Sequence, residues 1–386
     1  MDDIRKQFPR SDDDRPPCLI VGAGLTGATA AHMLRKAGWN VAVVERSEVV
    51  GGHVRNSWMR GLPYEPNGAH IFHTDDEAVW RLASSLVDFE PYLHQVRTRV
   101  GDLELSWPIQ LDELAALPEW GTIQHELTRL PDERDSSNFE TWCISLMGET
   151  LYHLFIEGYT TKQWGRPPSS LSCQFAPKRV DLRTDGYLPL FRDPYQGWPR
   201  QGYGALVEAL LADTPVILCE EVTQSNLASL VKPDVPVLLT CALDDFFDHS
   251  EGKLEWRGVH LVPHYLPDEM LAQNAMVVNE PDAAVEYTRT VETKWVFPEM
   301  HSQLGTVIAF EYPGSPAKHY PVLDAEGANE AMQARYSLRA DAFERNPLVT
   351  AGRLANYTYI NMDEAMRQGM DAAARVQQRV GRLVGV

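Results

Sequence analysis

The feature that most constrains this chain is a strand, a glycine-rich turn and a helix near its start. Residues 18–21 form an apolar run typical of a buried parallel strand. Gly22, Gly24 and Gly27 follow in a G-x-G-x-x-G pattern, and residues 28–37 continue as a helix. Glycines in this pattern allow a tight turn, close approach of the backbone to a pyrophosphate, and close packing of helix on strand. The pattern therefore predicts an α/β fold with a Rossmann-type dinucleotide-binding unit.

A second strand and a second glycine pair narrow the choice of dinucleotide. Residues 40–44 read as a strand that ends at Glu45, where a carboxylate is expected to accept hydrogen bonds from the ribose hydroxyls. Gly51 and Gly52 allow a second backbone segment to approach the pyrophosphate, which favours FAD over NAD. Thr26 in the turn and Arg46 beside Glu45 are further candidate cofactor ligands.

Charge and cysteine content exclude several classes of partner. The chain has 386 residues and a formal charge of −19, which argues against a nucleic-acid surface. An anionic substrate would need arginines gathered in its cleft. The five cysteines contain no C-x-x-C pair, so neither a structural metal site nor a disulfide framework is expected.

The sequence also predicts where the protein resides. There is no signal-peptide pattern and no long apolar run, so a cytoplasmic protein without a membrane partner is expected. Residues 1–16 are polar and charged and are expected to form a loose N-terminal arm.

The pattern of apolar runs predicts three parts. A discontinuous FAD-binding domain is expected over residues 17–90, 204–245 and 340–386, and a small helical domain over 108–165. The middle of the chain, over 91–107, 166–203 and 246–339, is then expected to carry the substrate. Residues 166–200 are expected to be mainly loop, with a short strand possible. The other predicted elements are helices at 76–86, 204–211 and 362–384, and strands at 215–220, 235–240, 257–263, 275–279, 285–291, 306–312 and 348–350.

Six segments, in order along the chain, together resemble the UDP-galactopyranose mutase family. They are GAHIFHT at 68–74, GYTTKQWG at 158–165, YQGWPRQGY at 195–203, VVNEPDAAVEYTR at 277–289, HYP at 319–321 and GRLANYTYINMDEA at 352–365. The resemblance implies an FAD domain, a helical domain and a twisted antiparallel sheet, with the active site between them. The sheet would comprise residues 91–107, 166–203 and 246–339, with a mobile lid near 165–195. It also implies an isomerase that interconverts the pyranose and furanose forms of a nucleoside-diphosphate sugar through a flavin N5–sugar adduct.

The resemblance implies that FAD acts in its reduced form, supplied by NAD(P)H or a reductase. UDP-galactose is the favoured substrate, and UDP-arabinose, a dTDP-deoxyhexose or a sugar of secondary metabolism are the close alternatives. Relatives are often dimers, which leaves monomer and homodimer both open. A flavin amine-oxidase-like oxidoreductase and a flavin protein without activity are the rival classes.

Two arginines and an asparagine are the resemblance's candidates for the diphosphate and the nucleotide. Arg289 ends the YTR segment and matches an arginine that contacts the diphosphate; a surface ion pair is the alternative. Arg179 matches the lid arginine, and Lys178 or Arg183 are its alternatives. Asn279 matches an asparagine near the nucleotide, although a turn-capping role is equally consistent. The expected catalytic residues are Arg289, Arg179 and His73.

The lid departs from the family pattern. A tyrosine is expected just before Phe191, but Leu190 stands there, and whether Tyr187 compensates is left open. The other substrate candidates are aromatic or lie beside aromatic residues, and a purely packing role is the alternative for the rings. They are Tyr159, Trp164, Tyr320, Tyr359 and Asn361.

The remaining candidates concern the flavin. Arg353 matches a flavin-binding arginine, and Met362 and Asp363 open the last helix, whose N-terminus would face the flavin's pyrimidine oxygens. His73 matches a histidine beside the isoalloxazine, and a buried structural role is the alternative for His70. His53 replaces a usual asparagine after the glycine pair, so the flavin geometry is expected to differ slightly.

Overall fold

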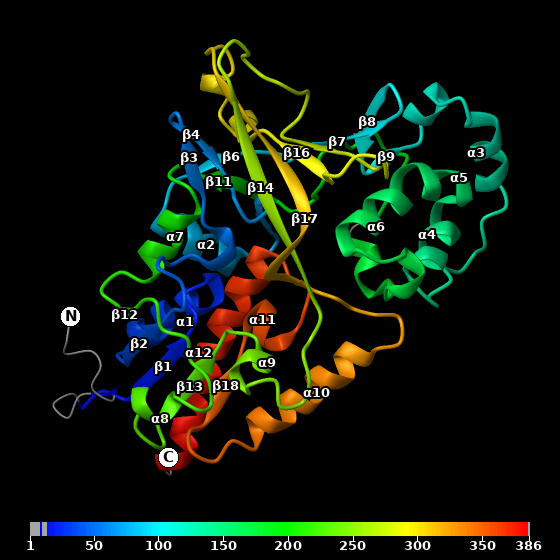
Figure 1. Cartoon of the computed structure of the whole chain (residues 1–386). Coiled ribbons are helices and arrows are strands. Elements are labelled where there is room, and N and C mark those ends of the chain that lie inside the picture. The colour runs from blue at the N-terminus through cyan, green and yellow to red at the C-terminus, as the bar shows by residue number, and fades with distance from the viewer. Residues whose placement is uncertain (1–7, 10–13, 179, 385–386) are drawn as a thin grey trace.

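The computed structural model describes residues 8–9, 14–178 and 180–384. Figure 1 shows a parallel sheet flanked by helices, a long twisted sheet above it, and a group of helices to one side. This architecture confirms the predicted fold class. The domain boundaries given above stay a prediction.

The parallel sheet forms where the sequence predicts it. Its strand order is β12-β2-β1-β13-β18, and every neighbouring pair is parallel. Helix α1 (Leu25–Lys36) packs against α12 (Met362–Val384) and α7 (Tyr203–Leu210). The strands are β1 (Pro17–Val21), β2 (Asn40–Val44), β12 (Val216–Ile217), β13 (Val237–Leu239) and β18 (Leu348–Thr350). Because chain start and chain end share this sheet, the cofactor unit is discontinuous.

The long helix over Ala328–Asp341 has no counterpart in the sequence analysis, and neither do the short helices over Leu227–Leu230, Leu243–Phe246 and Gly352–Asn356. Helix α10 (Ala328–Asp341) packs against α9 (Leu243–Phe246) and β18. Its buried face includes Asn329 and Gln333, whose amides donate to the carbonyls of Val322 and Ala355. A buried helix face made half of amide side chains gives little hydrophobic periodicity, which explains why it was missed.

The second large sheet has the order β14-β17-β16-β15-β7-β8. The sequence analysis predicts it to be antiparallel, but β15 pairs with β7 in parallel. Strand β17 runs from Thr306 to Pro321, well past its predicted end, and so reaches helix α11 (Gly352–Asn356). The other strands are β7 (Val96–Val100), β8 (Leu103–Trp107), β14 (Trp256–Leu266), β15 (Val277–Asn279) and β16 (Arg289–Val291).

Three small sheets and helix α2 surround the two large sheets. Residues 166–200, predicted as mainly loop, contribute two strands and short 3-10 turns. Helix α2 (Glu77–Leu86) begins at Asp76, whose carboxylate accepts from the N–H groups of Ala78 and Val79. The small sheets pair β5 (Phe72–Thr74) and β6 (Phe89–Pro91) with β11 (Tyr195–Pro199), β3 (Ser57–Met59) with β4 (Leu62–Tyr64), and β9 (Ile109–Gln110) with β10 (Leu182–Arg183).

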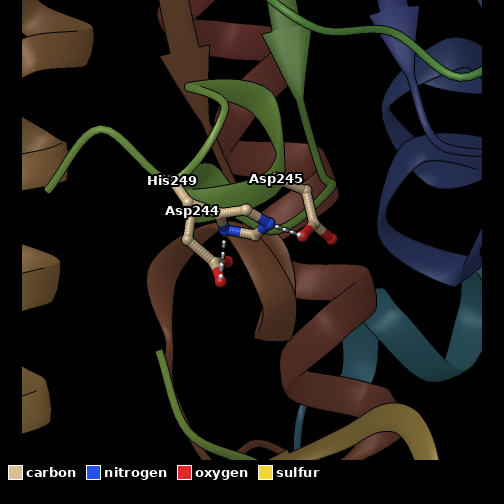
Figure 2. A group of neighbouring side chains, drawn as sticks. All are labelled: Asp244, Asp245 and His249. Carbon is tan, nitrogen blue, oxygen red and sulfur yellow. Dashed lines mark ion pairs between the residues drawn. The ribbon is translucent and has the colours of Figure 1, made fainter. Parts of the chain in front are cut away.

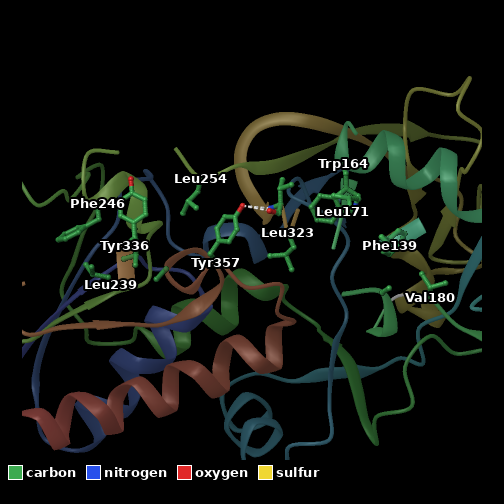
Figure 3. Packing of buried hydrophobic residues seen from close by; sticks show 14 of the residues in the cluster. Phe139, Trp164, Leu171, Val180, Leu239, Phe246, Leu254, Leu323, Tyr336 and Tyr357 are labelled. Atoms are coloured by element: carbon green, nitrogen blue, oxygen red, sulfur yellow. Dashed lines mark hydrogen bonds between the residues drawn. The ribbon is translucent and has the colours of Figure 1, made fainter. Parts of the chain in front are cut away.

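The helical group shares its core with the parallel-sheet body. It contains α3 (Trp120–Leu127), α4 (Phe139–Met147), α5 (Glu149–Leu151), a π-helical turn over Tyr152–Glu157 and α6 (Gly158–Trp164). One cluster of buried residues runs from Phe139 and Leu171 through Leu323 and Tyr357 to Phe246. Figure 3 shows this path, with the Tyr357 hydroxyl bonded to the main chain beside Leu323. The two regions therefore pack as one body.

Two predictions made from the sequence, the lid arginine and the loose N-terminal arm, lie wholly or partly outside the described residues. Arg179, the expected lid arginine, is one of them. In the expected loose arm, the structure describes Phe8, which pairs with Val231 and exchanges backbone hydrogen bonds with Leu230 and Lys232. This part of the arm is therefore attached to the body. Among the described residues, no helix is both long and apolar enough to cross a bilayer.

Candidate functional site

A first cavity of about 320 Å³ lies at the carboxyl ends of β1 and β2. Two glycine segments meet there, since a Cβ added to Gly52 would lie 3.2 Å from the Cα of Gly24. A Cβ on Gly24 would meet nothing within 4 Å, so this residue faces open space. The predicted cofactor residues that line the cavity are Gly22, Gly24, Thr26, Glu45, Arg46, Gly52, His53, His70, Arg353 and Met362.

Gly27 does not line the cavity but sets its shape. A Cβ there would lie 2.0 Å from the carbonyl oxygen of Gly22, so only glycine lets α1 pack this close to the turn. The pattern that predicts close helix–strand packing is borne out at this residue.

The carboxylate of Glu45 is buried and held by the main chain. Its two oxygens accept from the N–H groups of Ala23 and Ser47, both at 2.8 Å. These bonds fix the carboxylate at the cavity wall and leave it lone pairs for other donors. Such a fixed acceptor fits a ribose hydroxyl.

Histidines and a helix N-terminus form the other end of the cavity. His53 packs against His319, with ring centroids 4.3 Å apart, and burial, His319 and Arg353 hold the pKa of His53 well below its ordinary value. His70 Nδ1 lies 2.9 Å from a carboxylate oxygen of the buried Glu65. Met362 begins α12 at the same wall. Backbone donors and the neutral His53 ring here fit the flat, partly polar ring system of a flavin.

Asn361 lies at this end as well. The sequence analysis groups it with the substrate residues, but it lines the first cavity rather than the second. Its N–H donates to Glu364 at 2.8 Å, which caps the start of α12.

His73 and Asp363 are close to the first cavity without lining it. The His73 ring stacks on Phe191, with centroids 3.5 Å apart, and its Nδ1 lies 2.7 Å from Asp193. Burial raises the pKa of Asp363, and its Oδ1 has no hydrogen-bond partner. In this structure His73 is thus tied to the predicted lid.

Beside the first cavity, Asp244, Asp245 and His249 bring their ligand atoms within 4.8 Å of one another. Figure 2 shows the imidazole of His249 reaching toward both carboxylates. Lys318 Nζ lies 2.7 Å from Asp244 and 2.8 Å from Asp245. Because lysine already supplies the positive charge, we interpret the group as an ion-pair network rather than a metal centre.

A second cavity of about 180 Å³ lies between the helical group and the six-stranded sheet. Six residues that the sequence analysis assigns to the substrate line it together. They are Tyr159, Trp164, Asn279, Arg289, Tyr320 and Tyr359. Residues from four separate segments of the chain therefore meet in one place.

Arg289 is the charged group of the second cavity. Its Nη2 lies 2.7 Å from Glu311 Oε2, and Glu311 is fully buried on the neighbouring strand β17. Burial lowers the pKa of Arg289, but Glu311, Tyr159 and Tyr320 together more than offset burial, so the pKa lies well above its ordinary value. Its Nε finds no hydrogen-bond partner within the described part of the chain. One edge of the guanidinium is therefore held while a further donor remains for a ligand.

Two residues of the GYTTKQWG segment, Gly158 and Lys162, help to position Arg289. A Cβ on Gly158 would lie 2.1 Å from the carbonyl oxygen of Pro281, so glycine lets α6 touch the loop before β16. Lys162 Nζ donates to the carbonyls of Glu280, Asp282 and Tyr287 at 2.6 to 2.9 Å. Helix α6 thereby holds the loop that leads to Arg289.

An aromatic wall separates the two cavities. Tyr320 and Tyr359 stack with centroids 5.5 Å apart, and both line the second cavity. Arg353, which lines the first cavity, lies 5.3 Å and 5.7 Å from the two ring centroids. Ligands in the two cavities would meet beside this wall.

Two residues of the lid region lie differently from the family pattern. Leu190 lines the second cavity, whereas Tyr187 lines neither cavity. The Tyr187 hydroxyl donates to the carbonyl of Phe191 at 3.1 Å, and Arg192 lies over its ring. Tyr187 therefore does not compensate for Leu190 in this structure.

The sequence analysis missed three residues of the site. Glu311 and His94 have no motif of their own, and only the fold brings them to Arg289. Arg257 donates to the carbonyls of Lys162 and Gln163, which ties the end of α6 to β14. The one sequence feature that could have indicated Arg257 is Gly165, the glycine after α6, because it lies against the Arg257 guanidinium.

The fold and its first cavity define the class: a Rossmann-type dinucleotide-binding protein with a second, arginine-containing ligand cavity beside the dinucleotide. Residues 154–359 match the sequence model of the family described as GLF: UDP-galactopyranose mutase, and residues 20–86 match NAD(P)-binding Rossmann-like domains. The chain belongs to the UDP-galactopyranose mutase family. It is thus a nucleotide-sugar mutase, and the family and its Rossmann domain imply a flavin.

Individual relatives support this placement along nearly the whole chain. The chain is 28% identical to a dTDP-fucopyranose mutase of Escherichia coli, covering 92% of this chain and 97% of that protein. It is also 28% identical to a probable UDP-galactopyranose mutase of Klebsiella pneumoniae, covering 92% and 93%. The crystal structure of a reduced UDP-galactopyranose mutase shares the fold, with a TM-score of 0.76 at 16% identity over 94% of this chain and 96% of that one.

Proposed function

We propose that this protein interconverts UDP-galactopyranose and UDP-galactofuranose with reduced FAD in the first cavity and the nucleotide sugar in the second. One observation carries the proposal: Arg289 and four aromatic residues converge on a cavity that shares a wall with the dinucleotide cavity. When bound, the reduced flavin supplies a nucleophilic nitrogen for the anomeric carbon without net oxidation of the sugar.

Arg289 binds the diphosphate in this proposal. Its guanidinium stays charged at all relevant pH values, and Glu311 fixes its orientation before the ligand arrives. A diphosphate that leaves the sugar and later returns needs such a fixed partner, because it must not diffuse away in between.

Tyrosines complete the binding of the nucleotide. Tyr159 offers a flat ring for the base, and burial raises its pKa. Burial and Tyr359 raise the pKa of Tyr320 to about 12, so its hydroxyl keeps its proton and can donate to a phosphate oxygen. The surrounding apolar side chains exclude water from the reacting centre.

A dTDP-linked 6-deoxy sugar is the second candidate substrate. The match to the dTDP-fucopyranose mutase is as high as the match to the probable UDP-galactopyranose mutase, both at 28% identity. Leu190 also makes the lid side of the cavity more apolar than the family pattern predicts.

The test is turnover by the dithionite-reduced holoenzyme under anaerobic conditions. We expect UDP-galactofuranose to be converted to UDP-galactopyranose, read by chromatography, and no conversion by the oxidised enzyme. Conversion of dTDP-fucofuranose alone would transfer the proposal to the deoxy sugar. Hydrogen peroxide formed from an amine, with neither sugar converted, would show that the proposed function is wrong.

The source of electrons is tested separately. We propose NAD(P)H, directly or through a reductase, as the reductant. Anaerobic addition of NADPH to the oxidised holoenzyme should bleach the flavin absorbance. No bleaching by NADPH or NADH would leave the mutase proposal intact and point to a separate reductase.

A further inference from the structure

His94 is a buried polar residue of the second cavity, and it has no role in the function proposed above. It lies between β6 and β7, is 6% exposed, and lines the cavity together with Arg289. Among the residues that the structure describes, its Nδ1 has no hydrogen-bond partner. An unpaired ring nitrogen in a protein interior costs stability, so histidine at this position lowers the stability of the folded protein.

Lid residues contact both the main chain and the ring of His94. The His94 carbonyl accepts from the N–H of Leu190 at 2.6 Å, which docks the lid segment against it. Phe191 stacks over the His94 ring with centroids 6.1 Å apart, and the same phenyl ring stacks on His73 at 3.5 Å. A ring fixed in this way is ready to meet a ligand without losing further rotational freedom.

The charge state of the ring favours a neutral ligand group. Burial, Arg289 and His73 lower the pKa of His94 to about 3, so the imidazole is neutral at physiological pH. A neutral imidazole has one donor and one acceptor nitrogen, which matches a hydroxyl group better than a phosphate. Arg289 beside it already supplies the positive charge that a diphosphate requires.

The neighbouring lid residues Leu190 and Tyr187 offer no side-chain group that could hydrogen-bond a ligand hydroxyl in the cavity. Leu190 has no polar atom in its side chain, and the Tyr187 hydroxyl is bonded to Phe191 outside the cavity. Of these three residues near the lid, His94 is therefore the one whose side chain can hydrogen-bond a ligand in the cavity.

We propose that His94 hydrogen-bonds a hydroxyl of the sugar in the bound nucleotide sugar and so helps to select that sugar. This inference rests on the proposed function, because it places the sugar beyond the diphosphate held by Arg289. His94 is a binding and specificity residue in this view.

The test compares binding of UDP with binding of UDP-galactose to the oxidised holoenzyme by calorimetry. His94→Leu should weaken UDP-galactose roughly tenfold, the loss of one hydrogen bond, and change UDP less than about twofold. His94→Asn, whose amide can occupy the place of Nδ1, should bind UDP-galactose within about threefold of wild type. His264→Leu, the same change at an exposed histidine of β14, serves as the matched control.

Thermal unfolding gives a second, independent measure. Because Nδ1 is unpaired in the free protein, His94→Leu should have a Tm at or above that of wild type in the absence of nucleotide. A purely structural histidine would give a lower Tm and would weaken UDP and UDP-galactose alike.

Several outcomes overturn the inference. Equal weakening of UDP and UDP-galactose, or no weakening of either, would show that His94 does not contact the sugar. If wild type binds both nucleotides but converts neither sugar, the proposed function fails while the binding comparison still decides the role of His94. If wild type is an active mutase and His94→Leu matches it, this inference alone is wrong.

Discussion

The two cavities differ in which part of the chain shapes them, the backbone in one and side chains in the other. The dinucleotide cavity is shaped mainly by backbone: glycines that face each other, N–H groups that hold Glu45, and the start of α12. The second cavity is shaped by side chains that come from the helical group and the long sheet. Backbone shape tolerates almost no change, whereas a side-chain surface can be altered one residue at a time. A family can therefore keep its cofactor while its sugar changes.

The largest effect is expected in the backbone-built cavity. Gly27→Ala places a methyl group 2.0 Å from the Gly22 carbonyl, so α1 must shift. We expect a protein that is destabilised by about 3 kcal/mol or more and is isolated without flavin. The flavin absorbance per protein and the Tm measure both effects.

Gly24→Ala is the matched control for Gly27→Ala. Its methyl group meets no protein atom within 4 Å, so the fold should be kept. The methyl group would instead occupy space for the pyrophosphate, and flavin should be lost at an almost unchanged Tm of the apoprotein. Full flavin content in this variant would contradict our placement of the cofactor.

The next largest effect is expected at Arg289 in the side-chain-built cavity. Arg289→Ala should lower kcat/KM at least about 100-fold and leave the flavin spectrum unchanged. It also leaves the buried Glu311 without its partner, which costs about 3–5 kcal/mol of stability.

A double variant separates these two effects of Arg289. Arg289→Met combined with Glu311→Leu removes both charges and should recover most of the stability but none of the activity. Recovery of activity together with stability would show that Arg289 serves only the fold.

A moderate effect is expected from pH at the wall of the dinucleotide cavity. Burial, His70 and Arg353 lower the pKa of His319 to about 4, against about 6.5 in an unfolded chain. Between these values the unfolded state binds more protons, so stability falls as the pH drops from about 6.5 to 4 and does not change above 6.5. From pH 7 to pH 5 the loss from this residue is on the order of 2 kcal/mol.

Urea unfolding of wild type and His319→Asn at both pH values tests this prediction. Asparagine keeps an acceptor for the Val259 N–H that now bonds to His319 Nδ1. The acid-induced loss should therefore shrink in this variant. The exposed His264→Asn should leave it unchanged. An identical pH dependence in all three proteins would rule out His319 as the source.

The smallest effect is expected at Tyr187. Because this residue lines neither cavity, Tyr187→Phe should change kcat/KM less than about threefold. A loss above tenfold would mean that the lid brings its hydroxyl into the second cavity during turnover, and the comparison of the two cavities would need a third, mobile part.

Sequence patterns predicted the regular parts of the fold and failed where tertiary context decides. Strands β2 and β18 and helix α12 match their predicted ranges because apolar periodicity and glycine mark them clearly. Strand β17 was predicted to end near Tyr312, since Pro313, Gly314 and Pro316 usually stop a strand. Pairing with β14 continues instead through register shifts around Gly258, which accommodate these residues.

The site shows the same limit. Motif resemblance was sufficient to gather Tyr159, Arg289 and Tyr320 in one cavity, because each lies in a recognisable segment. Glu311 and His94 could not be found this way. Their importance depends on which strands become neighbours, a long-range property without a local pattern.

The core that joins the helical group to the parallel-sheet body has a consequence for ligand entry. Opening the second cavity by rotating the helical group as a hinge would expose Phe139, Leu171 and Tyr357 to water together. The segment around Leu190 is held instead by hydrogen bonds, from its N–H to His94 and from Arg183 to its carbonyl, and by the stack of Phe191 on His73, so displacing it would leave the shared core intact. The nucleotide sugar is thus expected to enter the second cavity by displacement of this segment, while the helical group keeps its position against the parallel-sheet body.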